Sequence, residues 1–467
     1  MPVIALASDA TSAGSGAPLA WATVAGVALG VAYAASPLTL WALAAIIGLF
    51  VWAGCGLTAR ERRWVWGLLA AAVALRLLTV AALFLASDPH QVTSFFWDGD
   101  GVYLKQRALW IRNVWLGVPV PQDYFEEAFA RIYGWTAYLY VLAYLQYWLG
   151  EAPYATHVFN IALFLAAVIL LYRMVRSAYG RPSALLGLGL LLFLPTPFLW
   201  SVAAMKESLA LLIAATAVVA TVALGRADGI VKRVVALLLL AGSVTSSSAV
   251  RVGGTLVLSL GAGVGVAGSV ILRRISLVVL SLTLVPYAGY RMLGHADVQA
   301  RMMSQLGTFA VQHLGHVRTE GNHYKLLDPQ LYSEPTKETA DNMTPGEGLR
   351  FVVRALVSLL IVPLPWQVKS ASELVFLLQQ VVWYMLVVLA AIGIVAGMRR
   401  DPLVTCLLLG VTAAGGAVIA LSSGNVGTMV RHRDTIVPFV VWLSALGAVA
   451  TASAWMSRAT SAQPSSQ

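Results

Sequence analysis

Long stretches of apolar sequence with almost no charge dominate this chain. Trp66–Leu85 contains a single charged residue, Arg76, and Leu209–Leu224 contains none. A helix of ~20 mainly apolar residues crosses a bilayer, so such windows predict transmembrane helices. Only 11% of the 467 residues are Asp, Glu, Lys or Arg, whereas about 25% is usual in soluble domains. The sequence therefore predicts an all-α polytopic membrane protein and excludes a soluble enzyme, a disordered protein and a nucleic-acid-binding module.

The apolar runs predict about twelve transmembrane helices. They cover residues 19–36, 38–57, 64–87, 154–175, 182–199, 203–224, 234–252, 254–271, 275–292, 374–398, 402–421 and 434–456. Two further apolar segments, 133–149 and 349–364, are short or interrupted. We expect these two to form interfacial or re-entrant helices that do not cross the membrane.

The connections between these spans form two sets that differ in charge. The cationic set contains Arg60, Arg62, Arg63, Arg173, Arg176, Arg181, Arg226, Lys232, Arg233, Arg273, Arg274, Arg399, Arg400 and Arg458. Cytoplasmic loops carry an excess of Lys and Arg, so this set should lie inside. Most of the 21 acidic residues and the long polar stretches 88–132 and 293–348 then lie outside. We expect a multi-pass protein of the cell inner (plasma) membrane with its active site on the non-cytoplasmic face.

The same pattern divides the chain into four parts. Residues 1–63 are expected to form an N-terminal helical hairpin, and 64–292 a transmembrane core that includes the external loop 88–132. Residues 293–373 form an external loop with an interfacial segment, and 374–467 form the C-terminal transmembrane helices.

The first chemical motif is Asp98-Gly99-Asp100, which opens the polar stretch after the third span. A tight turn at the glycine can aim both carboxylates at one point. One of them could then act as a general base, and the pair could hold a hard divalent cation such as Mg²⁺ or Mn²⁺. The alternative interpretation is a solvated Asp-Gly turn without chemistry.

The second motif is Lys206-Glu207, at the external start of an otherwise uncharged span. A helix N-terminus beside a lysine favours the binding of an anion. Alternatively, Lys206 pairs with Glu207 or a neighbour, or extends to the lipid headgroups.

The third motif, Ser243–Arg251, ends a span on the outer side with adjacent hydroxyl groups and an arginine. Arg251 could bind phosphate. The hydroxyl groups are better explained by packing of helix against helix, because Ser and Thr are common in such interfaces.

The fourth motif, Asn425–Asp434, contains Arg431 and Arg433. In an extended backbone residues two apart point to the same side, so we expect the two guanidinium groups to form a phosphate clamp. Their place at a membrane surface indicates a phosphorylated lipid as the ligand. The alternative is contact with bulk lipid headgroups, but this usually places arginines inside.

The remaining ionisable residues give weaker signals. Arg76 lies within a predicted span, where we expect it to pair with a neighbouring helix. His313, His316 and His323 share the late external loop. The first two have a spacing that could ligate zinc, but we expect histidines that are solvated or contact hydrogen-bond acceptors, because no carboxylate motif accompanies them.

The order of these motifs resembles the GT-C superfamily of membrane glycosyltransferases. The resemblance rests on Leu75-Arg76-Leu77, Asp98, Asp100, Tyr103, the stretch from Tyr172-Arg173 through Gly180-Arg181 to Pro195, Lys206-Glu207, and Arg431–Pro438. The chain departs from the family pattern in having two extra spans before the acidic loop, an acidic pair split by Gly99, and Lys-Glu at the 206–207 turn. It is also similar to membrane proteins of bacterial exopolysaccharide loci, including repeat-unit polymerases.

The resemblance implies a GT-C-like fold and a sugar donor linked to polyprenyl phosphate, with transfer outside the cytoplasm to a glycan, lipid or protein acceptor. Asp98 or Asp100 would remove the acceptor proton. The cations Arg431, Arg433, Lys206 and Arg251 would stabilise the leaving phosphate. The expected substrate-binding residues are Tyr103, Lys206, Glu207, Arg251, His323, Arg431 and Arg433. Membrane lipids are expected partners and nucleic acid is not; no cofactor is required, with a divalent cation at Asp98 and Asp100 left open.

Three alternatives stay open at this point. The chain could be a repeat-unit polymerase that acts on lipid-linked oligosaccharides, or a flippase or transporter of lipid-linked glycans. It could also be a structural subunit of a polysaccharide assembly complex. A flippase would need charges along a central cavity at midplane depth. The clustering of polar residues on one face favours an enzyme.

Overall fold

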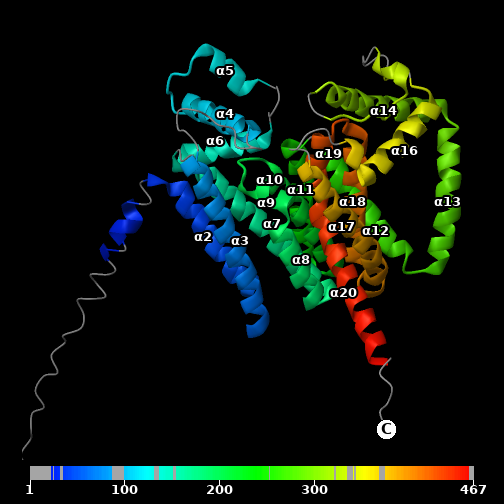
Figure 1. Cartoon of the computed structure of the whole chain (residues 1–467), viewed down its shortest axis with the longest axis horizontal. Helices are drawn as coiled ribbons and strands as arrows, with labels where there is room; N and C mark the ends of the chain where they lie inside the picture. Colours follow the sequence, from blue (N-terminus) through cyan, green and yellow to red (C-terminus); the bar gives the residue numbers. More distant parts are fainter. Residues whose placement is uncertain are drawn as a thin grey trace, which may run out of the picture.

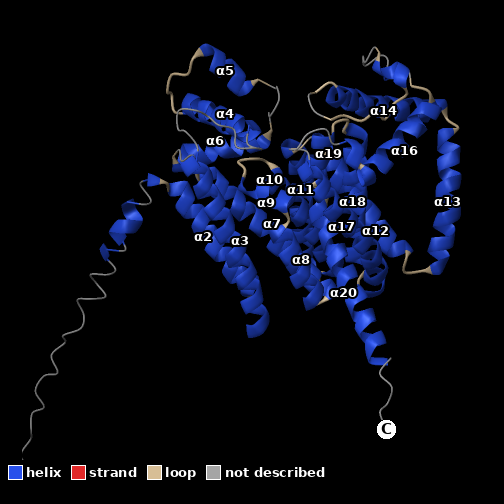
Figure 2. Cartoon of the chain, viewed as in Figure 1, coloured by secondary structure: helices blue, strands red, loops and turns tan. Residues whose placement is uncertain are grey.

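The computed structural model describes a helical membrane protein (Figure 1). The described residues are 23–24, 26–31, 35–86, 99–130, 136–150, 154–251, 253–319, 322–333, 340, 343–367 and 374–461. Figure 2 shows helices joined by loops, and no β-strand occurs within these ranges. The all-α prediction is therefore confirmed for the described part of the chain.

Ten helices of this part are long and apolar enough to cross a membrane. They are α2 (Pro37–Gly54), α3 (Ala59–Ala86), α7 (Ala155–Tyr179), α10 (Glu207–Arg226), α11 (Ile230–Val250), α12 (Gly254–Ile271), α13 (Ile275–Leu293), α17 (Leu374–Arg400), α18 (Pro402–Ser422) and α20 (Val437–Ser461). Two shorter helices, α8 (Arg181–Phe193) and α9 (Pro195–Val202), are apolar enough only when taken together and are bent by 59°, which fits either a broken span or a re-entrant loop. Within the expected span 19–36, residues 19–22, 25 and 32–34 lie outside the described part of the chain, so the total of twelve stays a prediction.

The remaining helices are too short or too polar to be counted as spans. They are α4 (Gly99–Trp115), α5 (Gln122–Phe129), α6 (Ala137–Leu149), α14 (Ala296–Val317), η1 (Pro329–Tyr332), α16 (Pro345–Ile361), η2 (Pro365–Gln367) and α19 (Val426–Arg433). At 13 and 17 residues, α6 and α16 reach ~20 and ~26 Å, less than a bilayer core of ~30 Å. They correspond to the two segments that we expected not to cross.

Glycines let the central helices pack closely. A side chain at Gly261 or Gly265 of α12 would meet the backbone of α18, and one at Gly410 of α18 would meet the backbone of Gly261. Gly393 of α17 and Gly447 of α20 likewise face each other's helices. Small residues bring helix backbones together where lipid offers no hydrophobic drive to associate.

Contacts join the cationic connections at one end of the bundle. Glu61, at the start of α3, binds Arg176 at 2.6 Å and Arg181 at 3.2 Å. Asp401, before α18, pairs with Arg226 at the end of α10. In Figure 1 the C-terminal end of α20 (red) lies at the bottom, whereas α4, α5, α6, α14 and α16 lie at the top. The basic connections and the polar helices therefore occupy opposite ends, as expected from the charge pattern.

Arg76 is buried in α3 and holds the bend between α8 and α9. Its guanidinium donates to the Leu192 carbonyl at 3.0 Å, to the Ser201 hydroxyl at 2.7 Å and to the Ala72 carbonyl at 3.2 Å. The rings of Phe164 and Phe198 lie 4.8 and 4.7 Å from it. Arg76 thus contacts neighbouring helices, as expected, through carbonyl, hydroxyl and aromatic groups.

Candidate functional site

The Lys206-Glu207 turn is positioned by a buried asparagine of α7. The side-chain amide of Asn160 donates to the carbonyls of Ala203 at 2.6 Å and Met205 at 2.8 Å. Its oxygen accepts the hydroxyl proton of Tyr138 in α6 at 3.0 Å. These bonds fix the turn between α9 and α10, so they fix the point at which Glu207 begins α10.

The Arg431 segment is helical, not extended. Asn425 caps α19, because its side-chain oxygen accepts from the amides of Gly427 at 2.8 Å and Thr428 at 3.4 Å. Residues two apart in a helix of 3.6 residues per turn point to nearly opposite sides. The expected clamp of Arg431 and Arg433 on a shared side is therefore wrong.

Arg433 points into the protein. It donates to the Gln380 side-chain oxygen at 2.7 Å and to the Val362 carbonyl, and it lies 4.9 Å from the Trp383 ring. Burial lowers the pKa of Arg433 to about 10. These contacts hold α19 against α17 and the end of α16.

Arg431 points toward the start of α10. Its guanidinium lies 5.0 Å from the Trp200 ring centre and 3.7 Å from the Glu207 carboxylate, and it contacts the Met205 sulfur at 3.9 Å. Two of the sequence motifs, more than two hundred residues apart, therefore meet at one place.

A cavity of about 130 Å³ begins beside this contact, between α9, α10, α11, α12, α18 and α20. Its polar lining includes Glu207, Ser208, Arg251 and Asp434. Most of the remaining lining is apolar, including Phe164, Leu211, Ile213, Val257, Leu258, Val411, Val418, Ile419, Ile436 and Phe439. An engineered cavity of ~150 Å³ is enough to bind benzene. The space can therefore take a short apolar segment whose polar end faces the charged residues.

Two polar atoms of the cavity lining are buried without a hydrogen-bond partner. They are the second carboxylate oxygen of Glu207 and the hydroxyl of Ser208. Ser208 is only 2% exposed. Buried polar groups are usually satisfied in native proteins, and together with Arg251 these two atoms make one end of the cavity polar.

Positive charge gathers around Arg431. Burial lowers the pKa of Arg251, while the nearby Glu207 raises it and Arg431 lowers it again. His432 lies within reach of the charges of Arg251, Arg431 and Lys206, and these add to burial in holding its pKa well below the ordinary value. Lys206, Arg251 and Arg431 thus form a cationic group beside a neutral histidine, with Glu207 as the carboxylate that contacts it.

A segment of the polar stretch 293–348 packs against the start of α19. The amide of Val426 donates to the Asn322 carbonyl at 2.7 Å, and that of Tyr324 donates to the Gly424 carbonyl at 3.0 Å. His323 forms an isolated β-bridge with Asn425 between these two bonds. Its side chain is exposed.

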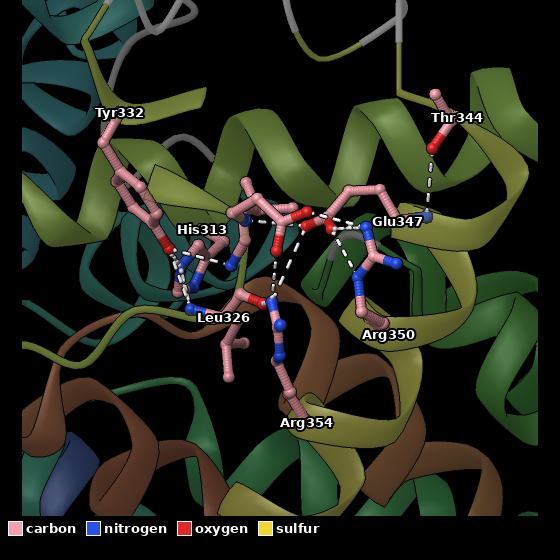
Figure 3. A network of polar contacts seen from close by, with 9 residues as sticks. His313, Leu326, Tyr332, Thr344, Glu347, Arg350 and Arg354 are labelled. Carbon is pink, nitrogen blue, oxygen red and sulfur yellow. Dashed lines mark hydrogen bonds and ion pairs between the residues drawn. The ribbon is translucent and has the colours of Figure 1, made fainter. Parts of the chain in front are cut away.

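His313 anchors the same segment (Figure 3). Its Nδ1 donates to the Ser423 carbonyl at 2.8 Å, so its Nε2 accepts the Tyr332 hydroxyl proton at 2.8 Å. The Tyr332 oxygen in turn accepts from the amide of Leu326 at 2.8 Å. Burial lowers the pKa of His313 to about 4, which matches a neutral ring. His316 binds the Ser422 carbonyl at 2.8 Å in the same way.

The prediction that these histidines contact hydrogen-bond acceptors is therefore confirmed for His313 and His316. Within the described ranges, no group of three or more His, Cys, Asp or Glu side chains is placed to hold a metal ion. The zinc alternative has no support among these residues.

Arginines of α16 complete the network in Figure 3. Asp328 pairs with Arg350 at 2.7 Å and with Arg354 at 3.0 Å. Glu347 accepts from the Asp328 amide at 2.7 Å and contacts Arg350 at 3.0 Å. The segment 322–333 is therefore tied to α14, α16 and the approach to α19.

The acidic loop lies at the limit of the described structure. Asp98 lies outside the described residues, and Asp100 is the second residue of α4. The ring of Tyr103 lies 5.4 Å from the Arg107 guanidinium. Burial, and then a hydrogen bond to Glu127, raises the pKa of Tyr103. The expected divalent cation at the two aspartates thus falls on residues whose side chains are not described.

Sequence reasoning brought Lys206, Glu207, Arg251 and Arg431 into one site but missed the residues that support them. Asn160 was detectable as a lone amide in an apolar span, and such residues usually have a function. Asp434 ends the fourth motif and Trp200 lies six residues before the second, but their contact joins segments 234 residues apart. No local pattern reveals a pairing at that distance.

No family model, no curated protein and no solved structure matches this chain. The resemblance to the GT-C superfamily therefore rests on the motifs alone.

Proposed function

We propose that this chain is an integral membrane glycosyltransferase that moves a sugar from a polyprenyl-phosphate-linked donor to an acceptor. One observation carries the proposal: a cationic group that adjoins the polar end of an apolar cavity, where Arg251 lines the cavity and Arg431 contacts Glu207 and Trp200 of its lining. Lys206, Arg251 and Arg431 would bind the lipid phosphate, and the cavity would take the first part of the apolar chain.

The chemistry requires a base and a stabilised leaving group. The acceptor hydroxyl attacks the sugar C1 and gives its proton to Asp98 or Asp100, while the bond from C1 to the phosphate oxygen breaks and its electrons leave with the phosphate. Fixed cations in a partly dry site stabilise this growing charge. No divalent cation is required, although the two aspartates could hold Mg²⁺ or Mn²⁺.

The position of the first turns of α4 supports the proposal that Asp98 and Asp100 lie beside this site. Lys105, in the second turn of α4, lies 3.2 Å from His157 Nε2. The other ring nitrogen of His157 lies 2.6 Å from the Val202 carbonyl, at the end of α9. The first turns of α4, which carry Asp100, therefore lie close to the turn that carries Lys206 and Glu207.

We assign the site to the non-cytoplasmic face of the inner membrane, in a GT-C-like arrangement. The cationic connections gather at the opposite end of the bundle, and such connections are usually cytoplasmic. A repeat-unit polymerase would use the same site with a lipid-linked oligosaccharide. A flippase is less well supported, because Arg76, a charge buried within a span, already binds backbone and side-chain groups of neighbouring helices.

Purified protein in proteoliposomes with a polyprenyl-phosphate-linked sugar tests the proposal, scoring transfer separately from translocation. Asp98→Asn or Asp100→Asn should abolish transfer, and Arg431→Gln should reduce it at least ~100-fold. Arg458→Gln, at the opposite end of the bundle, is the matched control and should keep the full rate. Full transfer by both Asn variants would remove the base assignment, and translocation without transfer would favour the flippase.

A further inference from the structure

Asp434 is a buried carboxylate that the proposed reaction does not use. It is 7% exposed and lies between α19 and α20. Its two oxygens accept from the Thr196 hydroxyl at 2.6 Å and from the indole N–H of Trp200 at 2.7 Å. Burying a carboxylate is expensive, so its presence at this position calls for a reason beyond packing.

Trp200 connects this carboxylate to the cationic group. Its indole is 5% exposed, and Arg431 lies 5.0 Å from the ring centre. A guanidinium is attracted to the negative face of an indole. The hydrogen bond to Asp434 prevents the ring from turning, and the ring supports the guanidinium from one side while Glu207 contacts it at 3.7 Å.

We propose that Asp434 and Trp200 are positioning residues that hold Arg431 ready for the phosphate of the lipid substrate. The carboxylate fixes the indole, and the indole fixes the guanidinium at the cavity. This inference rests on the proposed function, because it takes Arg431 as the phosphate ligand. A side chain that is ordered before binding loses less entropy when the ligand arrives, so the pair increases affinity by ordering Arg431.

Thr196 extends the arrangement to the start of α9. It donates to Asp434 and accepts from Gln379 of α17 at 3.3 Å. Asp434 therefore binds two residues of α9 that are four apart and lie on the same face of that helix. The bent helix, its tryptophan and the phosphate-binding arginine are held together by one carboxylate.

The test measures binding of farnesyl phosphate, a short polyprenyl phosphate, to the full chain in detergent at pH 8. Trp200→Phe keeps an aromatic ring but removes the N–H donor, and Asp434→Asn weakens the acceptor. Each should weaken binding by roughly 5- to 30-fold, the range of a desolvated cation–π contact. Arg431→Lys should weaken binding at least as much, because an ammonium cannot present the planar fork.

Trp383→Phe is the matched control. Trp383 also carries an arginine, Arg433, on its ring at 4.9 Å, but it lies outside the cavity lining. This variant should bind farnesyl phosphate as the wild type does. Inorganic phosphate as a competitor, compared with farnesol, separates binding of the headgroup from binding of the tail.

A double variant separates positioning from a general structural role. If Asp434 acts through Arg431, then Asp434→Asn should have little further effect on affinity in the Arg431→Lys background. Equal losses in both backgrounds would overturn the inference. Wild-type affinity in both Trp200→Phe and Asp434→Asn would also overturn it, while the proposed function would stand if Arg431→Lys weakens binding.

Absence of binding by the wild type would instead contradict the proposed function itself. Should Asp434→Asn fail to fold, Trp200→Phe alone decides the inference, because it leaves the carboxylate in place and keeps an aromatic ring at position 200.

Discussion

Replacement of Arg76 by lysine should lower the free energy of unfolding more than replacement by methionine, because lysine keeps the buried charge but loses most of its hydrogen bonds. The guanidinium makes three hydrogen bonds, to Ala72, Leu192 and Ser201, in a fully buried site. Lysine keeps the charge but has a single ammonium that cannot reach all three acceptors at once. Methionine removes the charge together with the donors.

The magnitudes follow from what each variant leaves unsatisfied. Arg76→Lys retains a buried cation that has lost most of its partners, a change that costs about 3–5 kcal/mol. In Arg76→Met the group left without a hydrogen bond is mainly the Leu192 carbonyl. This carbonyl belongs to the last turn of α8 and therefore has no partner within that helix. Ser201 keeps its bond to the Phe198 carbonyl. One unsatisfied carbonyl costs about 1–3 kcal/mol, so the Lys variant should be the less stable of the two.

The free energy of unfolding can be measured by titration with SDS in mixed micelles, followed by circular dichroism. Arg62→Lys, at an exposed position in the first turn of the same helix, provides a control for the substitution itself. A Lys variant as stable as the wild type would refute the three-point contact. A Met variant less stable than the Lys variant would show that the charge, and not the hydrogen bonds, is what stabilises the bend.

Three further predictions concern the site. Glu207→Gln should tighten farnesyl phosphate binding roughly fivefold, because it removes a negative charge beside the arginine that would bind the phosphate, and two like charges ~4 Å apart repel by ~1 kcal/mol in water; unchanged affinity in a fluorescence titration would place Glu207 away from the phosphate. Arg433→Met should lower the melting temperature but leave the affinity of the folded fraction unchanged, and a loss of affinity with full stability would restore Arg433 to the ligand site. Burial raises the pKa of Asp434 to about 7, against ~3.9 in an unfolded chain. For a carboxyl whose pKa is raised by folding, the stabilising effect is full below about pH 4 and is lost as the pH rises through about 7. The free energy of unfolding of the wild type should therefore fall relative to that of Asp434→Asn across this range. A difference between the two proteins that does not change with pH in SDS unfolding would contradict the buried carboxyl.

The fold was predictable from the sequence to the extent that the bilayer dictates it. Spans such as 154–175 and 254–271 coincide closely with α7 and α12, because crossing a membrane requires a long apolar helix whatever the tertiary contacts. The start of α10 was misplaced by four residues, because Asn160 holds residues 203–206 outside the helix. A boundary set by a long-range hydrogen bond leaves no local sign.

The candidate site was predictable in its charges but not in its geometry. Charged residues at the outer ends of spans indicated that Glu207, Arg251 and Arg431 could meet. The predicted orientation of Arg433 was wrong, because the prediction assumed an extended backbone for Arg431 and Arg433, whereas Asn425 caps a helix that contains both. Capping is readable in sequence, and it was the signal that should have decided this segment.

The central claim is that the lipid chain of the substrate lies in the cavity beside Arg431. Photo-crosslinking tests it most directly, with a polyprenyl phosphate that carries a diazirine in its first isoprene units and peptide mapping of the labelled full-length protein. The account predicts labels on Leu211, Leu258 and Val411, which line the cavity, and their loss in Arg431→Gln. Labels confined to outward residues such as Leu282 of α13, 70% exposed, and unchanged in Arg431→Gln, would contradict it.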